Sequence, residues 1–350
     1  MRPEHYFDYA ASTPLDPRVF EAMRPWLTER FGNASSSHSW GRRAREVVED
    51  ARELVAELAG AEPEEIAFTS CATEANNWII KAAEKVWFSP YEHACVRESA
   101  MAVGGQPLEV DGCTLLPPPE PGLVCVMTVC NETGAVIDVP DLPAGSKLHR
   151  DAVQSIGKLP LGTGGGDTAT FSAHKMYGPQ GVGAVYAVDG DFPSPLLHGG
   201  GQEPGGRSGT LNVAGIVGIG EACRIAAEEM EGDQEKAVAC REALMEILCG
   251  AEGVGINDHT MNSPFILSVT VMGIQAGTLV VDLDLQGYAV SGGSACSSES
   301  SAPSKVLLAL GLASNQATAT IRVSFGRFSS VDASADLGRA ILATAARLRG

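Results

Sequence analysis

The chain has 350 residues, of which 44% are hydrophobic and 19% are charged, and its formal net charge at pH 7 is −18. This length exceeds what one ordinary core supports, so we expect two domains or one large α/β domain with an appended unit. The negative surface disfavours nucleic acid as a partner, because it repels phosphate. No apolar run approaches the roughly 18 residues that a membrane helix needs, so no membrane partner is expected.

The nine cysteines form no CxxC pair and no His/Cys cluster with zinc spacing, so no metal site is predicted. The sequence starts MRPEHYFDYAAS, without an apolar signal region. A cytoplasmic location with reduced thiols is therefore expected.

Helical periodicity and buried strands alternate along most of the chain. Residues 39–59 have the pattern of an amphipathic helix that ends before Gly60, and 66–69 that of a short buried strand. The later segments are predicted as helices over 73–86, 213–230 and 237–248 and as buried strands over 123–128, 168–172 and 182–188. Continuous apolar strands between helices are typical of a mostly parallel sheet covered on both faces.

The pattern changes from residue 265, where shorter strands, a Gly/Ser-rich loop and a C-terminal helix follow. A helix is predicted near 305–310 and a strand over 321–325. We interpret 28–249 as a large domain, and 1–27 together with 250–350 as a smaller α+β domain.

Lys175 lies where an apolar strand meets the glycine-containing turn MYGPQG. A lysine at such a junction can reach into a cleft, lose its charge there and form a Schiff base. An isolated lysine is more often a solvated surface residue, so the neighbouring motifs must show which of the two roles Lys175 has.

Residues 71–77 (CATEANN) join a strand to a helix. Free N–H groups at a helix N-terminus bind phosphate, and Thr73 can add a hydroxyl. A plain N-cap by Thr73 or Ser70 explains the segment equally well. Asp151, in LHRDAVQ, also suits two roles: a partner for a protonated pyridine nitrogen, or a capping aspartate, which is the commoner role.

The segment SGGSACSS (291–298) is a loop of small residues with one thiol, Cys296. Structural cysteines usually lie among apolar neighbours, whereas this one has polar neighbours. A reactive thiol is therefore favoured over an incidental one.

Together these motifs resemble the cysteine desulfurases, which are pyridoxal 5'-phosphate (PLP) enzymes of the class V aminotransferase group. The resemblance runs from residue 7 to about residue 331. It is carried by the segments YFDYAASTPLDPRV, FGNASSSHSWGRRAR, EIAFTSCATEANN, NETGAVIDV, RDAVQSIGKLPL, FSAHKMYGPQGVGAVY, HGGGQEPGGRSGTLN, SGGSACSS and IRVSFGRF. It implies an α/β PLP-dependent transferase fold of the aspartate aminotransferase-like type I, and the subtype with a long catalytic loop.

The resemblance also implies roles for the catalytic residues. Lys175 would attach the cofactor covalently and later move the substrate's Cα proton. His93 would stack on the cofactor ring and shuttle a proton, Asp151 would pair with the pyridine nitrogen, and Gln154 would bind the phenolic oxygen. Cys296 would accept the sulfur as a persulfide.

The remaining implied roles concern the phosphate, the substrate and a second subunit. The residues that resemble the family's phosphate ligands are Ala72, Thr73, Ser172 and His174. Thr210 resembles the residue that reaches the phosphate from a second subunit, which implies a homodimer. Asn131 would lie near the phenolic oxygen and the substrate, and Arg322 would hold the substrate carboxylate with its planar fork.

The chain departs from the family pattern in several places. Cys71 stands where glycine is usual, Cys130 where asparagine is usual, and Arg150 where an apolar strand residue is usual. The stretch 81–150 is shorter than in typical members and lacks the usual helix between two strands. These departures concern the partner surface more than the cofactor residues.

The predicted function is PLP-dependent removal of sulfur from L-cysteine, which yields L-alanine and a persulfide for an iron–sulfur or thiolation acceptor protein. A low-activity paralogue that serves as a scaffold is a second hypothesis, motivated by the shortened middle segment. Selenocysteine lyase or another class V aminotransferase is a third, although a transaminase has no use for the Cys296 thiol.

Overall fold

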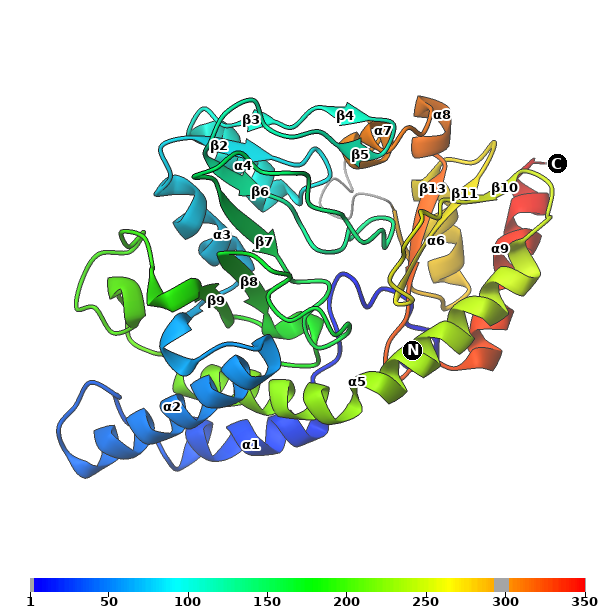
Figure 1. Cartoon of the computed structure of the whole chain (residues 1–350). Helices are drawn as coiled ribbons and strands as arrows, with labels where there is room; N and C mark the ends of the chain where they lie inside the picture. The colour runs from blue at the N-terminus through cyan, green and yellow to red at the C-terminus, as the bar shows by residue number, and fades with distance from the viewer. Residues whose placement is uncertain (1–2, 293–301, 350) are drawn as a thin grey trace.

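The computed structural model describes residues 3–292 and 302–349 (Figure 1). Its larger sheet has seven strands in the order β1-β9-β8-β7-β6-β2-β3. Their bounds are β1 Ile66–Thr69, β2 Val86–Phe88, β3 Gln106–Pro107, β6 Leu123–Cys125, β7 Lys147–Asp151, β8 Thr168–Ser172 and β9 Gly183–Ala187. In this sheet β9 points opposite to the other six described strands, so the prediction of a mostly parallel sheet is confirmed.

A smaller antiparallel sheet, in the order β10-β11-β13-β12, lies beside the larger one. Its strands are β10 Val254–Ile256, β11 Ile266–Val271, β12 Ser291–Gly292 and β13 Thr320–Ser324, and a separate hairpin joins β4 Val110–Asp111 to β5 Thr114–Leu115. A core cluster of this small sheet includes Phe7 near the N-terminus and Ile341 near the C-terminus. Segments near both ends of the chain thus pack with the small sheet, while the predicted division into domains 28–249 and 1–27 with 250–350 stays a prediction.

Helices cover both sheets. The α-helices are α1 Pro17–Thr28, α2 Ser39–Ala59, α3 Ala72–Lys81, α4 Ala94–Ala102, α5 Val213–Leu248, α6 Ala276–Leu285, α7 Lys305–Ala309, α8 Ser314–Ala317 and α9 Val331–Arg349. Short 3₁₀ helices are η1 Pro3–His5, η2 Pro63–Glu65, η3 Ala173–Lys175, η4 Val188–Gly190 and η5 Pro204–Gly206. No helix in this described part of the chain combines the length and apolar character needed to cross a membrane.

Two helix predictions were wrong. The helix predicted over 73–86 ends at Lys81, because Val86 already belongs to buried strand β2. The helices predicted over 213–230 and 237–248 are one helix, α5 (Figure 1). Gly232 does not interrupt it, and the next residue, Asp233, is held by a buried ion pair with Arg327 at 2.8 Å.

The shortened middle segment has a visible consequence. In the connection from β6 to β7, residues 126–146, no helix forms, which agrees with the predicted loss. The connection from β7 to β8, residues 152–167, also contains no helix, although no loss was predicted there. Parallel strands are usually joined through a helix, so loops replace helices beside these two strands.

Candidate active site

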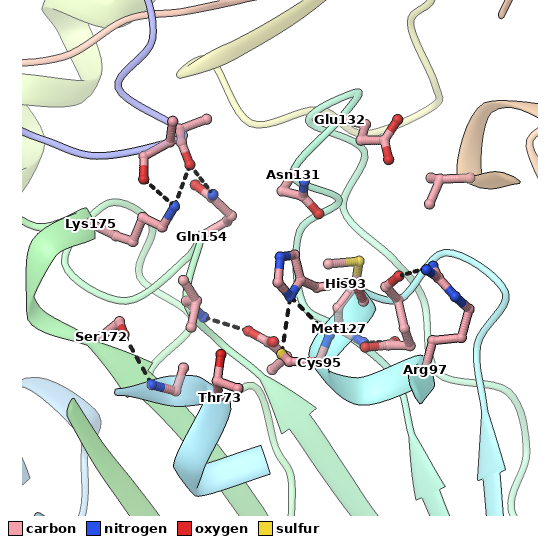
Figure 2. A pocket seen from close by; sticks show the side chains of 18 of the residues that line it. Thr73, His93, Cys95, Arg97, Met127, Asn131, Glu132, Gln154, Ser172 and Lys175 are labelled. Atoms are coloured by element: carbon pink, nitrogen blue, oxygen red, sulfur yellow. Dashed lines mark hydrogen bonds between the residues drawn. The ribbon is translucent and has the colours of Figure 1, made fainter. Parts of the chain in front are cut away.

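A cavity of about 540 Å³ lies at the carboxyl ends of β7 and β8. The predicted site residues that line it are Ala72, Thr73, His93, Asn131, Asp151, Gln154, Ser172, His174, Lys175 and Arg322, many of them visible in Figure 2. Thr210 is exposed and does not line this cavity. Cys296 lies outside the described residues, although the segment that follows it, 302–306, forms part of the wall.

Lys175 is presented by a rigid turn at the end of β8. Its Nζ donates hydrogen bonds to the carbonyl oxygens of Ala10 and Ala11, each at 2.6 Å (Figure 2). The turn is tied to the N-terminal segment, because Thr13 Oγ1 accepts from the backbone N–H of Tyr177 at 2.7 Å. Tyr177 has a φ of 64°, a left-handed conformation that an aromatic residue adopts only when its surroundings enforce it.

The N-terminus of α3 faces the same cavity. Cys71 is the N-cap and its side chain makes no capping hydrogen bond, so neither Thr73 nor Ser70 caps the helix. The backbone N–H of Ala72 donates to Ser172 Oγ at 3.1 Å. First-turn N–H groups at the positive end of a helix, next to a serine hydroxyl, form a site suited to an anionic phosphate.

Asp151 ends β7 and is buried, with 6% of its surface exposed. Its Oδ1 accepts from the backbone N–H of Val153 at 3.1 Å, and its Oδ2 accepts from Asn76 Nδ2 at 3.0 Å. Two donors thus fix the carboxylate at the cavity wall. A carboxylate held in this way can pair with a protonated ring nitrogen.

His93 caps the N-terminus of α4 through its ring. Nδ1 accepts from the backbone N–H of Cys95 at 3.2 Å and lies 3.0 Å from Cys95 Sγ (Figure 2). Burial lowers the pKa of His93, which keeps the imidazole neutral. Burial also raises the pKa of Cys95 to about 12, so this sulfur is a thiol and not a thiolate.

Gln154 lies between the N-terminal segment and a buried amine. Its Nε2 donates to the Ala10 carbonyl at 2.9 Å, and its Oε1 accepts from Lys158 Nζ at 3.2 Å. Burial, reinforced by the charge of Lys175, lowers the pKa of Lys158 to about 7. Burial and the same charge lower the pKa of His174 to about 4.

Arg322 closes the side of the cavity formed by the small sheet. Its Nη2 lies 2.7 Å from Asp8 Oδ1, and its Nη1 donates to the Asn131 carbonyl at 2.9 Å. Within the described residues its buried Nε has no hydrogen-bond partner. A planar guanidinium in this position suits a carboxylate ligand.

Two buried glutamates at the cavity had no predicted role. Glu132 accepts from Ser304 Oγ at 2.6 Å, and burial raises its pKa to about 7. Glu92 accepts from the backbone N–H of Met127 through Oε1. The sequence places Glu92 directly before His93, but a glutamate beside a histidine does not by itself indicate that the glutamate is buried.

These residues fit PLP. Separate parts of one cavity hold a phosphate site, the buried carboxylate of Asp151 and the amine of Lys175. These would serve, in that order, the phosphate, the pyridinium nitrogen and the aldehyde of PLP. The groups come from the carboxyl ends of adjacent strands and from one helix N-terminus. This is where α/β proteins bind such ligands.

Comparison with known proteins agrees with this chemistry. The family model described as "Aminotransferase class-V" matches residues 5–333. The cysteine desulfurase IscS of Colwellia psychrerythraea is 41% identical over 93% of this chain and 89% of its own length. That of Dictyoglomus turgidum is 37% identical over 94% of this chain and 91% of its own length.

Solved structures give the same result. A structure described as a NifS-like protein is 33% identical, with a TM-score of 0.88, and the match covers 98% of this chain and 100% of that one. The structure "SspA in complex with cysteine" is 30% identical, with a TM-score of 0.78, over 93% of this chain and 99% of that one. The chain therefore belongs to the PLP-dependent class V aminotransferase family, in the group that contains the cysteine desulfurases.

Proposed function

We propose that this protein is a cysteine desulfurase that removes sulfur from L-cysteine and releases L-alanine. The single observation that carries the proposal is the cavity in which Lys175, Asp151 and Arg322 converge. The relatives named cysteine desulfurase support this assignment, as does the related structure whose title records a complex with cysteine.

The residues at the cavity would have different roles, which follow from their chemistry. Bound PLP supplies an electron sink that weakens the bonds at the substrate's Cα and Cβ. Ala72, Thr73, Ser172 and His174 would hold its phosphate, and Asp151 would keep its ring nitrogen protonated. Lys175 Nζ would attach the cofactor and then carry the proton that leaves Cα.

Neutral His93 would stack on the ring, and Gln154 and Asn131 would bind its phenolic oxygen. Arg322 would hold the substrate carboxylate, which fixes the cysteine sulfur in one place. The Cys296 thiolate would attack that sulfur. The substrate's Cβ–S bond would break as an S–S bond forms on the enzyme, and the electron pair of the broken bond would stay on carbon. Cβ would take up a proton and Cα would regain the proton carried by Lys175, which gives alanine.

A second subunit and an acceptor protein complete the proposal. Thr210 is exposed and lies away from the cavity of its own chain, which supports a contact to the phosphate site of a partner chain in a homodimer. The persulfide would pass to an iron–sulfur scaffold or thiolation carrier in the cytoplasm.

The test measures both products. The PLP-loaded protein is incubated with L-cysteine and dithiothreitol, and alanine and sulfide are quantified beside Cys296→Ser and Lys175→Ala. We expect both variants to lose turnover, but only Lys175→Ala to lose the yellow covalent cofactor.

The matched control is Cys249→Ser, which changes an exposed cysteine at the end of α5. This variant should retain full activity. Full product release by Cys296→Ser would refute the persulfide mechanism, and a wild-type protein that binds PLP without making either product would favour the scaffold hypothesis.

A further inference from the structure

Asn76 connects two parts of the active site without lining the cavity itself. It lies on the second turn of α3 and is fully buried, with 0% of its surface exposed. Among the described residues its side-chain amide has four hydrogen-bond partners, all of them side chains, which come from β7, β8 and α4. A buried amide with every site occupied has one orientation, because turning it over would leave its partners unsatisfied.

The oxygen side of this amide is set by two donors. Asn76 Oδ1 lies 2.8 Å from Thr170 Oγ1 and 2.8 Å from His149 Nε2. Burial lowers the pKa of His149 to about 3, so its ring is neutral. Its Nδ1 lies 2.8 Å from Thr168 Oγ1, whose hydroxyl can donate while Nε2 donates to the amide.

The Nδ2 atom of Asn76 contacts Asp151 directly and His93 through Cys95. Asn76 Nδ2 donates one hydrogen to Asp151 Oδ2 at 3.0 Å and the other to Cys95 Sγ at 3.2 Å. Cys95 Sγ in turn lies 3.0 Å from His93 Nδ1. The same amide therefore bears directly on the aspartate and, through one thiol, on the histidine.

The contact at His93 has a consequence for its tautomer. Nδ1 accepts the backbone N–H of Cys95, so it cannot carry a hydrogen of its own. The Cys95 sulfur, which accepts from Asn76, lies beside the same Nδ1 at 3.0 Å. The neutral ring must then carry its hydrogen on Nε2.

We propose that Asn76 is a positioning residue that fixes the Asp151 carboxylate and, through the Cys95 thiol, the position of the His93 ring, whose Nε2–H tautomer is set by the Cys95 backbone N–H. This role rests on the proposed function, since it acts through two residues assigned to the cofactor. One buried amide would thereby couple the group that pairs with the pyridine nitrogen to the group that stacks on the ring.

The central test is Asn76→Asp in the full-length protein, stripped of PLP and titrated with it. This change keeps Oδ1 but replaces the Nδ2 donor by an oxygen about 3 Å from Asp151, where like charges disfavour ionisation. We expect PLP affinity to fall about tenfold or more, as the aspartate loses one donor and part of its charge. The pH dependence of the cofactor's absorption band should shift in the same variant.

A second readout follows His93 without any turnover. In protein with ¹⁵N-labelled histidine, assigned with His93→Gln, the wild-type ring should show the Nε2–H tautomer. Asn76→Asp and Cys95→Ala should both shift the His93 ring signals, because both change the thiol contact at Nδ1, and only Asn76→Asp should weaken PLP binding strongly. This separates the two branches of the contact network.

The matched control is Asn77→Asp, the same change one residue further along α3. Asn77 is partly exposed and donates to the Thr73 carbonyl, so PLP affinity and the His93 shifts should stay near those of the wild type. If Asn76→Asp fails to fold, Thr170→Val removes one donor to the amide with little change of shape. It should weaken PLP binding by about two- to fivefold.

The positioning role would be overturned if Asn76→Asp left both the PLP affinity and the His93 shifts unchanged. If Asn76→Asp does not fold, the same outcome in Thr170→Val would overturn it. Equal losses in Asn76→Asp and Asn77→Asp would do so too. Neither readout needs cysteine, so a protein that fails to make alanine refutes the desulfurase assignment and leaves this result intact.

Discussion

Replacing Glu92 by glutamine tests whether a buried carboxyl holds a proton beside the cofactor cavity. Glu92 has 1% of its surface exposed, and Oε2 has no hydrogen-bond partner among the described residues. Burial, reinforced by the charge of Asp151, raises its pKa from 4.5 to about 8. Glutamine keeps the shape and the acceptor for Met127 N–H but cannot ionise.

The magnitude follows from that pKa. A tenfold change in proton affinity is worth about 1.4 kcal/mol, so the rise to about 8 corresponds to about 5 kcal/mol. A carboxyl with a raised folded-state pKa contributes stability that is fully present below pH 4.5 and is lost as pH rises through about 8. Relative to wild type, Glu92→Gln should therefore gain about 1.4 kcal/mol per pH unit between about pH 5 and 7.5, with a plateau above 8.

The assay is urea unfolding of the PLP-free protein from pH 5 to 9, with folding followed by circular dichroism. Glu53→Gln on α2, where the glutamate is exposed, is the control and should follow the wild-type curve at every pH. Parallel stability curves for wild type and Glu92→Gln would mean that Glu92 is ionised in the folded protein, and the reasoning from burial would fail.

Three further predictions follow. Ser172→Ala removes the acceptor for the Ala72 N–H and should weaken PLP binding by about fivefold, the cost of about 1 kcal/mol, in an absorbance titration; unchanged affinity would contradict a phosphate role. Arg322→Lys loses the planar fork that contacts Asp8, so the KM for cysteine should rise by about tenfold or more while PLP affinity changes little. Equal losses of cysteine affinity and PLP affinity would instead indicate a folding defect. Burial lowers the pKa of His149 from 6.5 to about 3, so the stability that its neutral ring contributes is present above pH 6.5 and is lost as pH falls toward 3. In His149→Gln the free energy of unfolding should therefore fall less steeply below pH 6.5 than in the wild type. An unchanged slope would show that His149 is not buried as a neutral ring.

Most residues predicted for the cofactor site line one cavity, because they lie within short, ordered motifs. Asp151 ends one strand and Lys175 follows the next, and the carboxyl ends of neighbouring parallel strands meet at one edge of a sheet. That local rule is enough to bring them together. Thr210 needs a second chain and so remains a prediction, as does the reactivity of Cys296, which lies outside the described residues.

The features that the sequence did not reveal depend on contacts between distant elements. Asn76 received no role, because its four partners come from three other elements and no local pattern announces them. A signal was present nonetheless: Asn76 lies one turn after Ala72 and Thr73 and thus on the face of α3 that meets the sheet. The predicted break between residues 230 and 237 was wrong: the glycine in that gap, Gly232, lowers helix propensity by only about 1 kcal/mol, which packing on both sides outweighs.

The continuity of α5 has a mechanical consequence. In Figure 1, α5 runs from the large sheet to the small one. Its first half contributes Ile216 and Ile219 to a core cluster of the large sheet, and its second half contributes Leu244 and Leu248 to the core of the small sheet. Fraying at its centre would therefore loosen both cores together. We expect the two regions to melt in one cooperative transition, and a chain cut near residue 232 to yield neither half as a stable fragment.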